Sequence, residues 1–145
     1  MKKRVLFLCT HNSCRSQMAE ALLRFRCGDV YDAYSAGTEI SHVNPWAIRV
    51  MAERGVDLSG QVSEHLSKYV GQQFDAVVTT CDSAHQACPV FPGAKTLIHH
   101  SFRDPSGTTG SDEEILEVFR QVRDEIDAWI QETFAAHSIP ERSES

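Results

Sequence analysis

The stretch that decides the fold is residues 5–17, VLFLCTHNSCRSQ. An apolar run ends at Cys9, a polar loop follows, and Arg15 comes six residues after the cysteine. A short apolar run bounded by a polar loop is typical of a buried strand. In open α/β sheets, ligands bind at the carboxyl ends of such strands. The thiol of Cys9 and the fixed positive charge of Arg15 are therefore the first candidates for a functional site.

Length and composition indicate a globular protein with one domain. The chain has 145 residues, 41% of them hydrophobic, which is enough to build a core without disulfide bonds. Its apolar runs are much shorter than the roughly 20 residues of a membrane helix, and the one near the N-terminus is shorter than the roughly 7–15 of a signal core. We therefore expect a cytoplasmic location. The net charge of −6 disfavours nucleic-acid binding.

The five cysteines, Cys9, Cys14, Cys27, Cys81 and Cys88, are an odd number in a chain that shows no export signal. This count argues against a structural disulfide framework. We expect reduced thiols and, where a disulfide forms, a transient and functional one. For Cys14 and Cys27 the simplest interpretation is structural.

Strand and helix patterns alternate along the chain, which predicts an α/β fold. Strands are expected at 4–9, 30–37, 74–80 and 94–100, with helices at 16–28, at 45–54 and from 112 onward. Ser111 and Glu114 have the spacing of a capping box for the last helix. The alternation predicts a three-layer, four-stranded parallel sheet with helices on both faces. We expect a single domain at 1–136 and a flexible C-terminal tail at 137–145.

Four polar or reactive side chains follow the predicted strands and should share one rim of the sheet: Cys9, Ser35, Cys81 and Asp104. The segment from Cys9 to Arg15 has the pattern C-x5-R, and Ser16 then opens a helix. A loop that curls onto a helix N-terminus directs backbone N–H groups inward and makes a cradle for a tetrahedral oxyanion. The residues that would form it are Thr10, His11, Asn12, Ser13, Cys14, Arg15 and Ser16.

The same field would favour a thiolate at Cys9, which would then act as a nucleophile on the bound anion. Ser16 could donate a hydrogen bond to this thiolate, and Asn12 could brace the loop. The alternative is a core cysteine with a surface arginine, because a bare C-x5-R is a weak motif. Its place between a strand and a helix favours the oxyanion cradle.

At this point VLFLCTHNSCRSQMAEALLR resembles the signature of the low-molecular-weight protein tyrosine phosphatase family. SAGT, NPWAIRVMAERGVDLSGQ and RDP match later segments of that family in the same order, so the resemblance extends to about Phe134. It implies strand order 2-1-3-4, with Cys9 as the nucleophile, Arg15 as the oxyanion ligand and Asp104 as the general acid. Without the resemblance, Asp104-Pro105 could be an ordinary turn.

The family contains phosphatases and arsenate reductases, and the oxyanion cradle suits both substrates. VVTTCDSAHQACPV, with Cys81 and Cys88, resembles the redox segment of the thioredoxin-coupled arsenate reductases. On an intact helix two residues seven positions apart are separated by about 10.5 Å along the axis, which is too far for a disulfide. A bridge between Cys81 and Cys88 would therefore require this segment to unwind or to start as a loop. The alternative is that both cysteines are small buried apolar residues.

In the phosphotyrosine phosphatases of the family that this chain resembles, aromatic residues usually follow the Asp-Pro pair and hold the substrate ring. Here no aromatic residue lies between Asp104 and Ile115, so the resemblance favours a small inorganic anion over a tyrosyl ring. The resemblance therefore implies arsenate reduction through a relay of Cys9, Cys81 and Cys88 that thioredoxin resets. Glutaredoxin or another small thiol remains an alternative electron donor. A phosphatase that hydrolyses phosphomonoesters is the second interpretation, and a thiol redox sensor the third.

We expect a monomer with no bound cofactor and no metal, since no histidine or cysteine shows zinc-site spacing. Some reductases of the family bind potassium beside the loop. The matching oxygen donors here include Asn12, Glu20 and Ser35, but Lys68 stands where an acidic ligand is expected. The ammonium of Lys68 could take the place of the cation.

Overall fold

A computed structural model describes residues 2–82, 84 and 91–135. The predicted tail at 137–145 and Cys88 lie outside the described residues, and the prediction of a single domain at 1–136 stays a prediction. No helix in the described part of the chain is long and apolar enough to cross a membrane. The elements, in chain order, are β1 (Lys3–Cys9), α1 (Arg15–Cys27), β2 (Tyr31–Gly37), α2 (Pro45–Ala52), η1 (Leu66–Lys68), β3 (Phe74–Thr79), β4 (Ala94–His99), η2 (Pro105–Gly107) and α4 (Asp112–Phe134).

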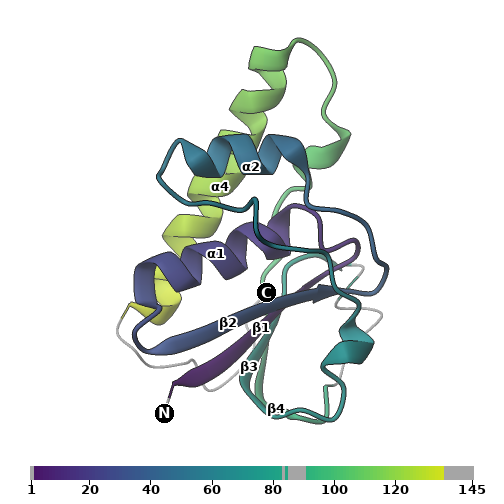
Figure 1. Cartoon of the computed structure of the whole chain (residues 1–145), viewed down its shortest axis with the longest axis vertical. Coiled ribbons are helices and arrows are strands. Elements are labelled where there is room, and N and C mark those ends of the chain that lie inside the picture. The colour runs from purple at the N-terminus through teal and green to yellow at the C-terminus, as the bar shows by residue number, and fades with distance from the viewer. Residues whose placement is uncertain (1, 83, 85–90, 136–145) are drawn as a thin grey trace.

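The four strands form one parallel sheet in the order β2-β1-β3-β4, which confirms the predicted order. The register pairs Cys9 with Gly37, Leu8 with Thr79, and Thr79 with His99. The carboxyl ends of all four strands therefore lie along one edge (Figure 1). The loops that follow β1, β3 and β4 emerge at this edge, where the candidate site residues were expected.

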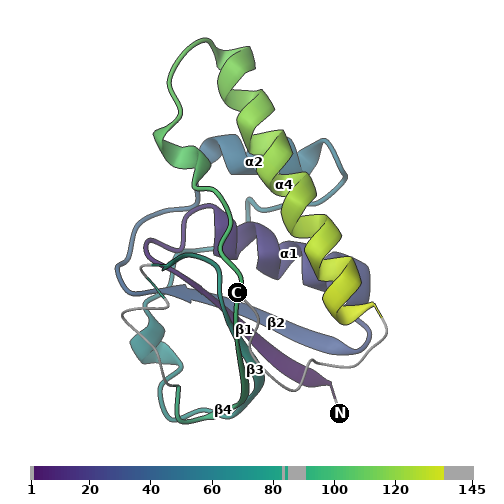
Figure 2. The ribbon, with the colours of Figure 1, turned by 180° about the vertical axis from the view of Figure 1, so that it is seen from behind.

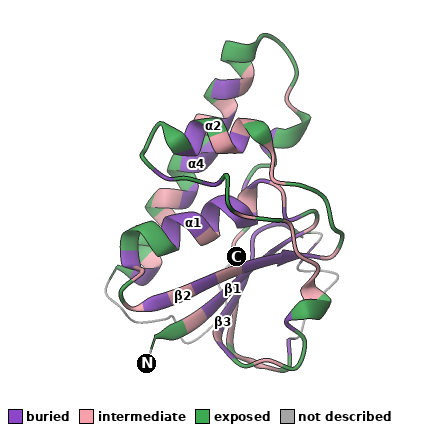
Figure 3. Ribbon diagram, viewed as in Figure 1, coloured by how far each residue is buried: buried purple, intermediate pink, exposed green. Residues whose placement is uncertain are grey.

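Each face of the sheet has its own hydrophobic core, because neighbouring residues of a strand point to opposite faces. Val5 and Phe7 of β1 pack with residues from α1, α2 and α4, whereas Leu6 and Leu8 pack with Tyr69 next to η1 and with other residues. Figure 2 shows α4 running across α1 and α2 on the first face. Strands β1, β2 and β3 are buried along most of their length, and the exposed residues concentrate on the outer helix faces and loops (Figure 3).

The starts of two helices follow the capping chemistry expected from the sequence. The side chain of Asn44 accepts a hydrogen bond from the Trp46 amide ahead of α2, and Ser111 and Glu114 form both bonds of a capping box ahead of α4. The N-terminus of α1 is different, because no side chain caps it. Its first N–H groups are therefore available to a ligand.

Helices α2 and α4 are joined by a buried arginine that lies on the apolar face of α4. The Arg123 side chain is 5% exposed, and its guanidinium donates to the Val50 carbonyl, to Glu53 and to Asp124, each at 2.8 Å. Hydrogen bonds from Arg120 lower the pKa of Glu53 to about 2. Bonds from Arg123 act in the same direction, and together they outweigh the opposing effect of burial. Arg123 therefore connects the last turn of α2 to the middle of α4.

Replacing Arg123 with methionine should lower the free energy of unfolding by about 1–3 kcal/mol, because the Val50 carbonyl loses its buried partner and two carboxylates lose a donor. Urea denaturation would measure the change. Arg54→Met is the matched control, since Arg54 is more than half exposed and bonds at 3.1 Å to Oδ1 of Asp124, the oxygen that Arg123 also contacts. The control should stay within about 0.5 kcal/mol of the parent protein. Equal losses in both variants would contradict the role given to Arg123.

Candidate active site

Hydrogen bonds hold the carbonyl groups of the loop between β1 and α1 away from its concave side. The backbone carbonyls of residues 9–14 all accept bonds from groups outside the loop's concave side. The donors, in order, are the amides of Thr38 and Glu39, the side chains of Ser63 and Gln17, and the amides of Asn44 and Met18. In a trans peptide the C=O and the following N–H point in opposite directions. The N–H groups of residues 10–15 are therefore directed inward, as an oxyanion cradle requires.

Asn12 braces this loop, as the sequence suggested. It has a left-handed backbone (φ 50°) and is fully buried. Its amide donates to Ser16 Oγ at 2.8 Å, and its side-chain oxygen accepts from the Glu64 amide at 2.8 Å and from Gln17 at 3.0 Å. Ser16 is thus engaged by Asn12, and no bond from Ser16 to Cys9 is present among the described residues.

The end of β2 supports the same loop. A Cβ atom at Gly37 would lie 2.6 Å from the Thr10 carbonyl and 2.9 Å from the Asn12 amide. Only a residue without a side chain allows the two segments to approach this closely. Gly37 was not a candidate from the sequence, although its place directly after a predicted strand, within SAGT, was the available signal.

Cys9 and Cys81 lie together at the base of the cradle. They belong to one buried cluster, each thiol shifts the pKa of the other, and both residues are 4% exposed. Cys81 Sγ also lies 3.5 Å from Thr10 Oγ1 and 3.4 Å from the Ala84 amide. Adjacent strands β1 and β3 bring the two residues to this point, as the predicted strand order required.

The surroundings of the two thiols shift their pKa values in opposite directions. The interaction with Cys9, with further bonds from Thr10 and the Ala84 amide and the charge of Arg15, lowers the pKa of Cys81 to about 5 against the effect of burial. The interaction with Cys81 and burial outweigh the charge of Arg15 and raise the pKa of Cys9. The sequence predicted a thiolate at Cys9, whereas these surroundings favour the thiolate at Cys81.

Arg15 crosses the mouth of the cradle with one donor left free. Its Nη1 donates to the Phe102 carbonyl at 3.1 Å, and its Nη2 lies 3.5 Å from the Asp104 carboxylate. Its Nε is buried and has no partner among the described residues. An unpaired buried donor is costly, so this N–H is a natural contact for an anion.

Asp104 faces Arg15 from the start of η2. Burial tends to raise its pKa, but hydrogen bonds from the Ser106 amide (3.0 Å) and hydroxyl (2.7 Å), together with the charges of Arg15 and His11, outweigh burial and lower it. Asp104 is therefore ionised before a ligand arrives. An oxyanion bound to Arg15 would offset the positive charge that favours this ionised form.

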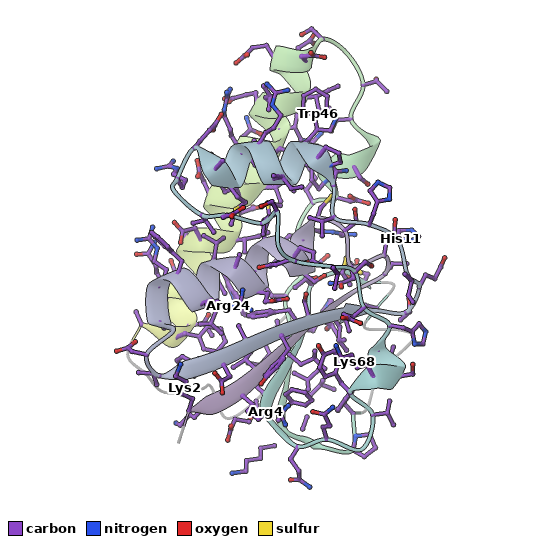
Figure 4. All side chains as sticks on the ribbon, viewed as in Figure 1. Lys2, Arg4, His11, Arg24, Trp46 and Lys68 are labelled. Atoms are coloured by element: carbon purple, nitrogen blue, oxygen red, sulfur yellow. The ribbon has the colours of Figure 1, made fainter. Side chains whose placement is uncertain are left out.

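Above these groups lies a cavity of about 210 Å³, lined by Cys9, His11, Ser13, Cys14, Arg15, Ser41, His42, Asn44, Asp104 and Ser106. No phenylalanine, tyrosine or tryptophan is among these described lining residues. The volume is below the roughly 300–1,000 Å³ of pockets for larger organic ligands. In Figure 4, His11 marks this edge of the molecule. The sequence identified the groups at the base, but not the rim residues Ser41, His42, Asn44 and Ser106, which come from loops without a chemical motif.

A second pocket beside the loop is lined by Glu20 and Ser35, two of the three oxygen donors considered for potassium. Glu20 accepts from Ser35 at 2.5 Å and pairs with Arg24 at 2.5 Å, and Glu64 pairs with Lys68 at 3.0 Å. Each carboxylate therefore already has a basic partner, and Arg24, not Lys68, meets Glu20. This donor set does not fit a resident cation. Nor do the described residues contain a group of three or more His, Cys, Asp or Glu side chains placed to hold a metal.

Known proteins with similar sequences and folds agree with this geometry. An arsenate reductase from Halalkalibacterium halodurans is 48% identical over 134 residues, which cover 92% of this chain and 96% of the relative. A solved arsenate reductase in a phosphate-binding state is 34% identical and superimposes with a TM-score of 0.80, covering 94% of this chain and 99% of that one.

A third relative is longer than this chain. The thioredoxin-dependent arsenate reductase from Corynebacterium glutamicum is 30% identical with a TM-score of 0.67, and the match covers 93% of this chain and 61% of that protein. The model of the low molecular weight phosphotyrosine protein phosphatase family matches residues 4–141. The chain belongs to this family.

Proposed function

We propose that this protein reduces arsenate to arsenite with electrons from its own thiols, which thioredoxin then restores. The observation that carries the proposal is the contact between Cys81 and Cys9 at the base of the oxyanion cradle. A phosphatase finishes its reaction with water and needs no second sulfur there. The arsenate reductases among the relatives support the same chemistry.

In the first step the Cys9 sulfur bonds to arsenic while an arsenate oxygen leaves as water. The inward amides of residues 10–15 and the free Nε of Arg15 hold the oxyanion. The Cys9 proton passes to the Cys81 thiolate. Asp104, protonated from solvent once the anion occupies Arg15, donates to the departing oxygen.

In the second step Cys81 passes the proton it received to an arsenic-bound oxygen and, as a thiolate, attacks the Cys9 sulfur. A Cys9–Cys81 disulfide forms, and the arsenic–sulfur bond breaks with its electron pair moving to arsenic, which becomes arsenite. Cys88 then attacks Cys81, which releases Cys9 and leaves a Cys81–Cys88 disulfide. Arsenate, two thiols and two protons thus give arsenous acid, a disulfide and water.

Thioredoxin is the proposed partner, because the attack of Cys88 on Cys81 leaves a protein disulfide that a dithiol reductant can reduce. The site then needs no resident cofactor and no metal. We place the protein in the cytoplasm as a monomer, where reduced thiols are the normal state of cysteine.

Replacing Cys88 with serine tests the relay. One equivalent of enzyme should still release close to one equivalent of arsenite, because Cys9 and Cys81 supply the electron pair. Continuous turnover with thioredoxin, thioredoxin reductase and NADPH should stop, since no thiol remains to release Cys9. Cys27→Ser is the matched control, because Cys27 is buried against Phe134 on the other face of the sheet and should leave both measurements unchanged. Normal cycling in the Cys88 variant would contradict the proposal.

A further inference from the structure

The side chain of His99 lies between the end of β3 and the residue next to Cys81. His99 is the last residue of β4, and its side chain is 9% exposed. Its Nδ1 lies 2.8 Å from Thr79 Oγ1, and its Nε2 lies 3.0 Å from the Asp82 carboxylate. The bridge therefore ties the chain that follows β3 to the end of β4.

The contact with Asp82 places a proton on Nε2 of this imidazole, because a carboxylate accepts hydrogen bonds and does not donate them. On the other side of the ring, Thr79 Oγ1 lies 2.8 Å from Nδ1 and 3.4 Å from the Ile98 carbonyl, to which it donates. Nε2–H then donates to the Asp82 carboxylate, which makes a charge-assisted bond.

The bond between His99 and Asp82 holds the chain on the C-terminal side of Cys81. Before Cys81, the amide and hydroxyl of Thr80 both donate to the Leu8 carbonyl at 2.8 Å and attach the chain to β1. After Cys81, the Asp82 carboxylate is held by His99. Cys81 is thus anchored on both sides, and its sulfur is directed at Cys9.

We propose that His99 and Asp82 are positioning residues that hold the Cys81 sulfur against Cys9 and so promote the Cys9–Cys81 disulfide. The inference rests on the relay given under Proposed function and adds two residues that its chemistry does not use. Positioning raises the effective concentration of one thiol at the other. Loss of the anchor should therefore weaken the disulfide rather than the binding of the oxyanion.

The experiment uses the full chain with Cys88→Ser, so that Cys88 cannot compete with Cys9 for a disulfide with Cys81. The protein is equilibrated with mixtures of reduced and oxidised glutathione, in which one oxidised glutathione and the two thiols give the disulfide and two reduced glutathiones. Mass mapping then gives the fraction with the Cys9–Cys81 disulfide. Asp82→Ala should lower the equilibrium constant about tenfold, the effect of losing a hydrogen bond to a charged group, which corresponds to about 30 mV.

Four further variants separate positioning from a general structural effect. Asp82→Asn keeps an oxygen that can accept a hydrogen bond from Nε2–H. It should therefore lower the equilibrium constant for the disulfide only about threefold. Asp29→Ala removes an exposed carboxylate in the turn between α1 and β2 and should change nothing. His99→Asn should match Asp82→Ala, and the double variant should be no weaker than either single one, because both remove the same bond. If His99→Asn fails to fold, the Asp82 variants still test the proposal, because Asp82 is exposed.

The outcomes distinguish this inference from the proposed function. If the Cys88→Ser parent forms no Cys9–Cys81 disulfide at any glutathione ratio, the relay itself is wrong. If the parent forms the disulfide and Asp82→Ala matches Asp29→Ala, the relay stands and the positioning role is wrong. Inorganic phosphate should protect Cys9 from alkylation equally in every variant, and loss of this protection in Asp82→Ala would also overturn the positioning role.

Discussion

Replacing Cys81 with serine should abolish thioredoxin-coupled arsenate reduction, with a loss of at least about 10³-fold in turnover. A serine hydroxyl can still hydrogen-bond to Cys9 and to Thr10 at nearly the same positions. It cannot attack the Cys9 sulfur to form a disulfide, so arsenic has no route to its electron pair. A coupled assay that follows NADPH oxidation in the presence of arsenate would measure the loss.

The same variant separates the two activities that the family contains. Hydrolysis of a small phosphomonoester needs Cys9, the cradle and water, so Cys81→Ser should retain it within a few-fold, whereas Cys9→Ser should lose both reactions. A control for the loss of a buried thiol is Cys27→Ser, which lies outside the cradle and packs against Phe134 on the other face of the sheet. Undiminished arsenate reduction in Cys81→Ser would leave hydrolysis as the function of the site.

The arrangement of charge around the two sulfurs explains why Cys81 is suited to this role. In the free protein the pKa of Cys81 lies below the ordinary value for a thiol and the pKa of Cys9 lies above it. This difference favours a neutral thiol at Cys9, so an incoming arsenate anion meets less negative charge inside the cradle.

The local chemistry of the cradle could be predicted from the sequence, because strand, loop and helix follow one another within 13 residues. A strand that ends at Cys9 and a helix that begins at Arg15 leave few paths for the loop between them. The predicted sheet order also placed Cys81 near Cys9. The sequence could not show which sulfur carries the charge, because Thr10 and the Ala84 amide reach Cys81 only through the folded arrangement.

Long-range polar contacts were the other features that the sequence did not reveal. Arg123 falls between Phe119 and Ile126 on the apolar stripe of α4, at the helical spacing of a buried position. A charged residue at such a position indicates a partner, but the partners Val50 and Glu53 lie about 70 residues away in the chain. The bridge from His99 to Asp82 is hidden for the same reason, since it joins two strand ends through side chains.

The second large effect is expected at Arg15. Arg15→Lys should lower kcat/KM for arsenate by about 10²–10³-fold, the cost of removing a donor that is placed for an oxyanion. Lysine keeps the positive charge but presents a single ammonium group. It cannot bond the Phe102 carbonyl, face Asp104 and still offer a separate N–H to the anion, as the guanidinium does. Unlike Cys81→Ser, this variant should lose phosphomonoester hydrolysis to a similar degree, because both substrates depend on the cradle.

The matched control is Arg103→Lys, at an exposed arginine one residue before Asp104, the proposed general acid. Its substitution should change kcat/KM by no more than about twofold, since exposed positions outside a site have small effects. Phosphate, which competes with arsenate for the cradle, gives a binding measurement free of turnover: its inhibition constant should rise in Arg15→Lys and stay constant in Arg103→Lys. If Arg15→Lys binds phosphate as tightly as the parent protein, the positive charge alone holds the anion. The planar fork and its free Nε would then have no part in recognition.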